Sequence, residues 1–379
     1  MSLDDPKTKS IMEIFEASME NVYGKFKNIP DPSSWIPPSV GGHRGRYLWT
    51  DAFGVMNFLT LYKMYSDLKA EHVHPEKYLA FAKRLVETVH DVLGRTRDGN
   101  SRLPGATKFE PLAGGLRIGK VDETGPDCDG QYHHYLTLWM FALNRMSMAT
   151  GDPTYNRQAC SLGKAIHPHF FIGLYTDNPH MVWKVSMDLS HPLVSSQGNL
   201  DPLDGYVIYS LVQASAREFG DGQVFKEEIS SYKKLFSSRL QSIPSMDFLD
   251  VGMTLVSTQW FYGVEDWATT VASRCFKILR ALINQDNCLQ DGSDRIAFRE
   301  FGASLGISCF RGAVGTKGQL YDYYKRFSDN LLGQYNDGNI KIPDSLEPIT
   351  RVMHAAALIP GAFYVGFFGP EPIKAKDLA

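Results

Sequence analysis

The stretch QYHHYLTLWMFALNRMSMAT, residues 131–150, decides the fold of this chain. From Tyr135 to Leu143 nearly every side chain is apolar or aromatic, so a helix formed here has almost no polar face. A helix that is apolar all round is buried on all sides. The sequence therefore predicts that this helix lies inside a shell of other helices.

A second stretch, PEKYLAFAKRLVETVHDVLGRT, has the opposite character. Phe81, Leu85 and Val89 recur every four residues, and charged side chains occupy the positions between them. This spacing is typical of an amphipathic surface helix, and Gly94 is a suitable C-terminal cap.

The two kinds of helix alternate along the chain. The pattern predicts twelve helices, near residues 8–26, 49–67, 76–94, 130–150, 153–167, 203–218, 222–239, 247–260, 263–284, 296–308, 316–332 and 347–358. The even-numbered ones are the more apolar, and no strand with period-two alternation is evident between them. Six inner helices ringed by six outer ones explain this alternation. The predicted fold class is all-α, an (α/α)6 toroid.

Two connections are unusually long, 95–129 and 168–202, and both are rich in apolar residues. Structureless loops of this length are uncommon unless they have a function. Each runs from an outer helix to an inner one, so we expect both at the same end of the ring. No Pro/Ser-rich linker divides the chain, which favours a single domain over 1–379 with a frayed tail from about residue 369.

Composition restricts the classes of protein to which the chain can belong. It has 379 residues, 43% apolar and 12% aromatic, with a net charge of −3. The sequence has no basic stripe of the kind that nucleic-acid-binding proteins show. It also has no apolar run long enough to predict a membrane span. The five cysteines are scattered, and the N-terminus does not have the order of a signal peptide. We therefore expect a cytoplasmic protein, and the sequence leaves its oligomeric state open.

Polar side chains cluster where the predicted inner helices begin. If these ends meet at one opening, they form a funnel of acids, arginines, histidines and tryptophans above an apolar barrel. The catalytic candidates are Asp51, Glu123, Asp129, His134, Asp204 and Glu300. The substrate-binding candidates are His43, Arg44, Arg46, Trp49, Asp127, Gln131, His133, Trp183, Asp188, Asn199, Trp260, Arg299 and His354.

Several of the acids have a simpler interpretation. An Asp at a helix start usually caps free backbone N–H groups, and we interpret Asp201, Asp247 and Asp250 in this way. Asp51 lies among apolar neighbours and needs a partner, which Arg44 or Arg46 could provide.

Three segments resemble a known superfamily: GGHRGRYLWTDAFGVMNFL (41–59), DETGPDCDGQYHHYLTLWMFALNR (122–145) and IAFREFGASLGI (296–307). They look like a group of proteins placed with the six-hairpin glycosidases. The resemblance covers nearly the whole chain. It implies a toroid and a carbohydrate substrate, without assigning catalytic residues.

The first hypothesis is a glycoside hydrolase that acts on a small or oligomeric saccharide. Such enzymes use one protonated and one ionised carboxyl group, about 6.5–9.5 Å apart in inverting enzymes. Asp129 or Glu123 would face Asp51, Asp204 or Glu300 across the mouth. No cofactor is needed.

The second hypothesis is a sugar epimerase or isomerase on the same toroid. Two histidines would take and return a proton, since the imidazole pKa suits this role near neutrality. His134 and His354, on the fourth and twelfth helices, are the candidates.

The third hypothesis is a magnesium-dependent enzyme that acts on an isoprenoid diphosphate. Asp122, Glu123, Asp127 and Asp129 would hold Mg²⁺, and Arg44, Arg46 or Arg299 would bind phosphate. The cluster does not match the usual acidic motifs of terpene cyclases. Apart from this alternative, no metal site is predicted, and the common nucleotide-loop, zinc-protease and serine-hydrolase motifs are absent.

Overall fold

Helices make up most of the described chain. The structure, a computed structural model, describes residues 5–38, 47–68, 73–125, 127–285, 296–314, 319–338 and 342–371. Its twelve α-helices within those ranges are α1 Pro6–Tyr23, α2 Leu48–Leu68, α3 Glu76–Leu93, α4 His133–Thr150, α5 Pro153–Phe170, α6 Asp201–Glu218, α7 Lys226–Arg239, α8 Phe248–Thr258, α9 Asp266–Gln285, α10 Ala297–Val314, α11 Gln319–Asn336 and α12 Glu347–Leu358.

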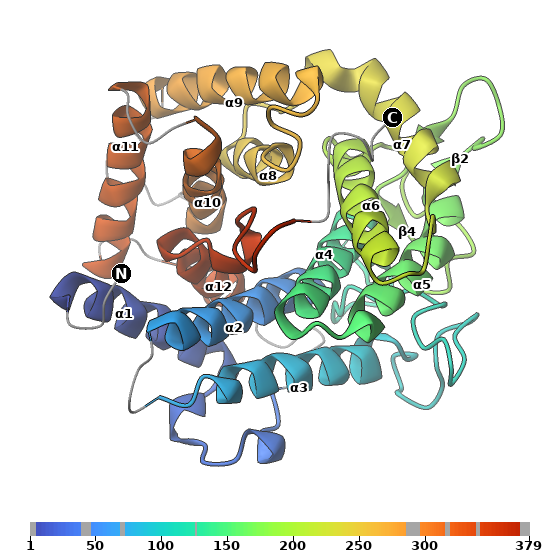
Figure 1. The fold of residues 1–379 in the computed structure, drawn as a ribbon. Coiled ribbons are helices and arrows are strands. Elements are labelled where there is room, and N and C mark those ends of the chain that lie inside the picture. Colours follow the sequence, from blue (N-terminus) through green and yellow to red (C-terminus); the bar gives the residue numbers. More distant parts are fainter. Residues whose placement is uncertain are drawn as a thin grey trace.

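The even-numbered helices form a closed inner ring. Each contacts the next along the chain, and α12 returns to contact α2 (Figure 1). The odd-numbered helices lie outside, each against an even-numbered neighbour. The predicted (α/α)6 toroid is therefore confirmed.

Burial follows the two kinds of helix seen in the sequence. In α2 every residue from Leu48 to Leu61 is buried, as expected for an inner helix. In α3 the buried side chains follow a single face, which includes Phe81, Leu85 and Val89. An outer helix buries one apolar face against the ring, and that face stabilises it. An inner helix is covered on several faces, so it needs apolar side chains on each of them.

Several helix ends differ from the predicted ones by two or more residues. The helix α4 begins at His133, because Gln131 and Tyr132 form the short strand β1. The helix α10 continues to Val314, six residues past its predicted end.

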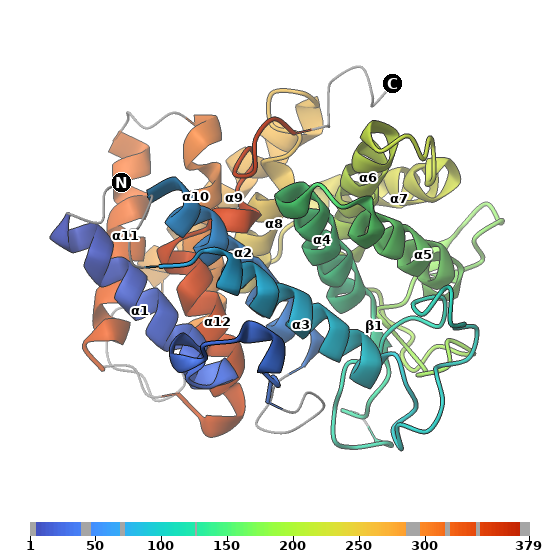
Figure 2. The same cartoon turned by 60° about the horizontal axis from the view of Figure 1, so that its bottom comes forward.

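Four two-residue strands lie in or beside the long loops of the described chain, although the sequence predicted none. They are β1 Gln131–Tyr132, β2 Phe171–Ile172, β3 His180–Met181 and β4 Lys184–Val185, and they pair as β1–β4 and β2–β3. Strands this short are below the length at which a period-two pattern can be recognised. The β1–β4 pair joins loop 168–202 to the start of α4, and loop 95–129 lies beside it (Figure 2). The two loops thus lie at the same end of the ring, as predicted.

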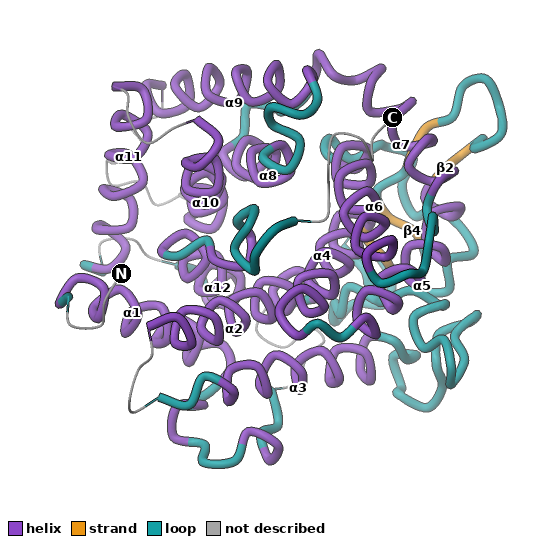
Figure 3. The backbone as a smooth tube through the Cα atoms, viewed as in Figure 1, coloured by secondary structure: helices purple, strands orange, loops and turns teal. Residues whose placement is uncertain are grey.

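The segment after α12 turns into the centre of the ring (Figure 3). The ring of Phe363 lies 4.7 Å from that of Phe53, centroid to centroid. The Gln259 side chain donates to the Phe363 carbonyl at 2.9 Å and accepts from the Val365 N–H at 3.2 Å. This segment fills the middle of the toroid. Within the described residues, no helix combines the length and apolarity that a bilayer span requires.

Candidate active site

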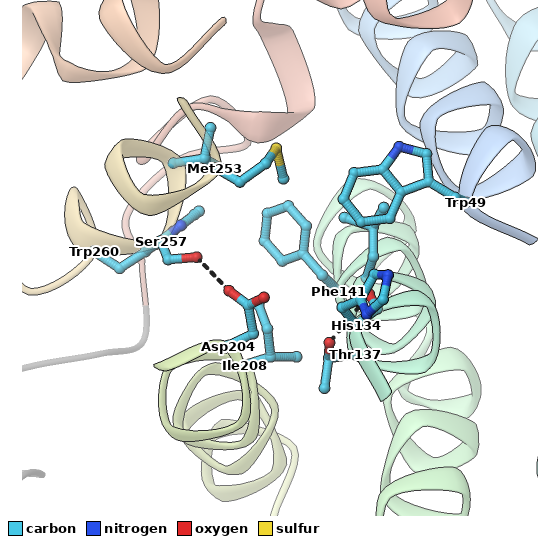
Figure 4. Close-up of a pocket in the computed structure, with 11 residues that line it drawn as sticks. Trp49, His134, Thr137, Phe141, Asp204, Ile208, Met253, Ser257 and Trp260 are labelled. Carbon is cyan, nitrogen blue, oxygen red and sulfur yellow. Dashed lines mark hydrogen bonds between the residues drawn. The ribbon is translucent and has the colours of Figure 1, made fainter. Parts of the chain in front are cut away.

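A cavity opens where four inner helices begin. It has a volume of about 290 Å³, and a smaller space of about 30 Å³ continues from it toward the ring centre. The outer part is lined by Trp49, His134, Trp183, Gln197, Gly198, Asn199, Leu200, Asp201, Asp204, Leu249, Asp250 and Met253. The inner part shares Trp49, His134, Asp204 and Met253, and adds Thr137, Leu138, Phe141, Ile208, Val256, Ser257 and Trp260 (Figure 4).

Asp201 lies in the first turn of α6, almost fully buried, between two histidines of α4. Its Oδ1 atom lies 3.5 Å from Nδ1 of His133 and 3.6 Å from Nδ1 of His134. Burial alone would raise the pKa of Asp201, but the two imidazoles outweigh burial and hold the pKa below its ordinary value. Asp201 is therefore a carboxylate at neutral pH.

Asp204 lies one turn further along α6 and has the opposite protonation state. Its carboxyl faces the cavity and accepts a hydrogen bond from the Ser257 hydroxyl at 3.0 Å (Figure 4). Burial, together with the nearby charge of Asp201, raises the pKa of Asp204 to about 8. Asp204 is therefore a protonated acid at neutral pH.

A third carboxyl group, that of Asp250 on α8, lines the outer part of the cavity. Its Oδ2 atom accepts hydrogen bonds from Asn199 at 2.7 Å and from the Ser245 hydroxyl. Asn199 also lines the cavity, so this pair offers both an amide and a carboxylate to ligand hydroxyl groups.

Aromatic side chains form much of the remaining wall. Trp49 comes from α2, Trp183 from loop 168–202, and Trp260 follows α8. The rings of Trp49 and His134 meet edge to face, 6.0 Å apart. Flat aromatic surfaces beside a few convergent polar groups are typical of a small-molecule site.

Six residues proposed from the sequence line this cavity: Trp49, His134, Trp183, Asn199, Asp204 and Trp260. They come from α2, α4, α6, the end of α8 and one long loop. The expected convergence of inner-helix starts therefore holds for this part of the ring.

Asp129 has a different environment from the one expected. Its Oδ2 atom accepts from Arg117 at 2.6 Å and from Arg97 at 3.2 Å, and its Oδ1 atom accepts from the N–H groups of Gly119 and Gly130. A carboxylate held by this many donors anchors loop 95–129 and is poorly placed for catalysis.

Gln131 and Asp188 also have structural contacts. The Gln131 side chain bonds to the backbone of Gly114, Leu116 and Met187, which fastens the two long loops to each other. Asp188 accepts from Ser186 and Ser190 within its own turn.

The acidic cluster proposed for magnesium does not assemble into a site. Asp122 and Glu123 are exposed, Asp127 pairs with Lys120, and Asp129 pairs with arginines. Across the part of the chain that the structure describes, no group of three His, Cys, Asp or Glu side chains is arranged to hold a metal ion. The isoprenoid diphosphate hypothesis therefore loses its proposed magnesium ligands, while its phosphate-binding candidates Arg44 and Arg46 lie outside the described residues.

Three other catalytic candidates are buried in the helix framework and do not line the cavity. Asp51 is fully buried and accepts a hydrogen bond from the Tyr23 hydroxyl at 3.0 Å. Glu300 is buried on α10. His354 bonds to Ser18 of α1 at 2.9 Å, so it does not face His134 across the cavity as the epimerase hypothesis required.

The other proposed binding residues have varied positions. Arg299 pairs with Asp247, which caps α8 as expected by accepting from the N–H groups of Leu249 and Asp250. His133 is fully buried behind the cavity wall. His43, Arg44 and Arg46 lie outside the described residues.

Two acids of the cavity were not among the candidates predicted from the sequence. Asp201 and Asp250 were interpreted as helix caps, but neither side chain caps its helix. The spacing DPLD was an available signal, because residues three apart lie on the same face of a helix. The contacts that distinguish Asp201 from a cap come from α4, which no local pattern reveals.

Comparison with known proteins agrees with the fold. No family model matches the chain, and no curated protein is similar in sequence. Among solved structures, a family 76 glycoside hydrolase from a bovine Bacteroides thetaiotaomicron strain is similar with a TM-score of 0.57 and 12% identity, over 95% of this chain and 79% of that one. A sugar epimerase from a ruminal bacterium has a TM-score of 0.54 and 12% identity, over 92% and 98%.

A cellobiose 2-epimerase from Bacillus thermoamylovorans is also similar, with a TM-score of 0.52 and 12% identity over 87% of this chain and 88% of that one. The chain therefore has the six-hairpin toroid that its sequence resemblance implied. Identities this low establish the shared fold only.

Proposed function

We propose that this protein is a carbohydrate-active enzyme that hydrolyses a glycosidic bond. One observation carries the proposal: Asp201 and Asp204, three residues apart on α6, line the same cavity with pKa values displaced in opposite directions. Paired groups with opposed protonation states are the usual basis of acid–base catalysis near neutral pH. The similar structures named as a glycoside hydrolase and as sugar epimerases add support for a sugar substrate.

In this mechanism Asp204 is the general acid. Its proton passes to the glycosidic oxygen as the bond to the anomeric carbon breaks. A water molecule attacks that carbon, and His134 takes the water proton. Asp201, beside Nδ1 of His134, balances the positive charge that the imidazole gains. Asn199 and Asp250 bind sugar hydroxyl groups, and Trp49 and Trp183 provide stacking surfaces.

The first prediction concerns Asp204→Asn. Because the amide has no acidic proton, we expect kcat on unactivated oligosaccharides to fall by about 10²- to 10⁴-fold. The loss should be much smaller for aryl glycosides whose phenolate leaves without protonation. Release of reducing sugar and of phenol from a matched substrate panel measures both.

Asp247→Asn is the matched control, since this carboxyl caps α8 outside the cavity and its loss should leave kcat nearly unchanged. Equal rates for wild type and Asp204→Asn on both substrate types would refute the assignment. Failure of the wild type to release sugar from any member of the panel would count against hydrolysis itself.

An epimerase remains the second candidate, favoured by the position of His134 in the cavity wall. His134 would take a proton from a sugar carbon and Asp204, on another side of the cavity, would return one (Figure 4). Incubation of free sugars with the enzyme in D₂O distinguishes the reactions. Deuterium at a sugar carbon without bond cleavage indicates an epimerase, and cleavage without exchange indicates a hydrolase.

A further inference from the structure

Behind the cavity wall, His133 connects Asp201 to a buried tyrosine of an outer helix. Nε2 of His133 lies 2.8 Å from the hydroxyl of Tyr232 on α7. Its buried Nδ1 has no regular hydrogen-bond partner among the described residues, and it lies 3.5 Å from Oδ1 of Asp201. All three side chains are almost completely buried, so the chain Tyr232–His133–Asp201 is shielded from solvent.

The charge on Asp201 determines where the proton of His133 resides. A carboxylate can only accept, so a proton on Nδ1 of His133 is favoured over a lone pair facing Asp201. Its Nε2 then has a lone pair that needs a donor. Burial keeps the pKa of Tyr232 well above its ordinary value, so the phenol retains its proton and can donate it to Nε2.

The surrounding helices are shaped to admit Tyr232. A Cβ atom at Gly205 of α6 would lie 2.3 Å from Cε1 of Tyr232, so the glycine leaves the space that the ring occupies. The rings of Phe171 and Tyr209 pack against that of Tyr232, at 5.2 and 4.9 Å between centroids. The Tyr232 side chain of the outer helix α7 thus passes α6 at Gly205 and contacts His133 of α4.

We propose that Tyr232 is a positioning residue that fixes His133 in its Nδ1–H tautomer and thereby orients Asp201 toward His134. This role rests on the proposed function where it concerns catalysis. The tautomer itself does not depend on any activity. The wrong tautomer would present a lone pair to the Asp201 carboxylate and repel it.

Nitrogen NMR of the full chain labelled with ¹⁵N-histidine tests the tautomer without substrate. His133 is assigned from the signal that is lost in His133→Gln. We expect a protonated Nδ1 and an unprotonated Nε2 at neutral pH in the wild type. A proton on Nε2, or on both nitrogens, would overturn the proposal, and this measurement needs no Tyr232 variant to fold.

Tyr232→Phe then removes the donor alone. We expect the His133 nitrogen signals to move toward a mixture of tautomers, and kcat to fall about 5- to 10-fold, the equivalent of one hydrogen bond. Tyr324→Phe on α11 is the matched control, because this buried hydroxyl donates to the Phe276 carbonyl and not to His133. Unchanged His133 signals in Tyr232→Phe would overturn the proposal, whether or not the enzyme hydrolyses sugars.

Discussion

At the scale of single residues, Asp201 and Asp204 show how position decides chemistry. Both are aspartates in the first turn of α6, and an isolated helix would treat them alike. Two histidines of α4 stabilise the charge of Asp201, whereas Asp204 has a hydroxyl and the charge of Asp201 nearby. The difference in their pKa values therefore arises from burial, from the histidines of α4 and from the charge of Asp201 itself.

This difference predicts how stability depends on pH. Native Asp204 keeps its proton up to about pH 8, whereas in the unfolded chain it loses the proton near 3.8. Between these values the native state binds more protons, so the free energy of unfolding falls as pH rises. In the wild type we expect the free energy of unfolding to fall by about 3 kcal/mol between pH 5 and 8. Full burial would give a larger fall, but the cavity leaves the Asp204 carboxyl part of its hydration. Asp204→Asn should remove this fall.

Urea unfolding at several pH values measures this slope for the wild type and Asp204→Asn. Asp247→Asn again serves as the control and should shift the curve without changing its slope. Parallel curves for wild type and Asp204→Asn would mean that the carboxyl is ionised in the native state, and the assignment as general acid would fail.

At the scale of elements, glycines let the inner helices α8 and α10 approach each other closely. A Cβ atom at Gly252 of α8 would lie 2.0 Å from the Gly302 carbonyl oxygen of α10. At Gly306 of α10 it would lie 2.4 Å from the Gly252 carbonyl oxygen. The absence of side chains lets the two backbones meet, which holds the start of α8 and its cavity residues in place.

Gly252→Ala should therefore destabilise the protein. The new methyl group meets backbone and not a flexible side chain, so we expect a loss of about 3 kcal/mol, at the upper end for overpacked cores. Gly333→Ala in α11 is the control. A Cβ atom there meets nothing within 4 Å, and alanine should stabilise that helix by up to about 1 kcal/mol. Chemical denaturation compares the two, and similar small effects would show that the helices are further apart.

At the scale of the whole molecule, an ion pair fastens the segment after α12 to the inner ring. The carboxylate of Glu371 accepts two hydrogen bonds from the buried Arg145 guanidinium, at 2.9 and 3.1 Å. That guanidinium also lies 4.7 Å from the ring centre of Trp260, which lines the inner part of the cavity. The segment after α12 is thus connected to the floor of the candidate active site.

Glu371→Gln tests this connection. It leaves the buried charge of Arg145 without its carboxylate, so we expect a loss of about 3 kcal/mol in the free energy of unfolding. Asp221→Asn, which breaks an exposed pair with Arg157, is the control and should cost under about 1 kcal/mol. Urea unfolding of the two variants gives the comparison, and equal losses would contradict a structural role for the Glu371 contact.

The sequence by itself determined the ring. The uniformly apolar stretch 131–150 and the one-sided pattern of 75–96 are local properties, and their alternation predicts an inner and an outer layer. The two long loops were recognised by their length. The order of the helices predicted that both loops lie at the same end of the ring. Candidates such as Trp49, His134 and Asp204 were identified because they are polar or aromatic residues at inner-helix starts.

Only the tertiary structure decided which acids belong to the cavity. Asp129 pairs with Arg117 and Arg97 and so does not belong to the cavity. Asp201 lies between His133 and His134, which precede it by 68 and 67 residues in the chain. A carboxyl group looks the same in sequence whether it pairs with arginine or faces a substrate. Its role depends on burial and on charges within a few ångströms, and these are set by packing between helices that the local sequence does not record.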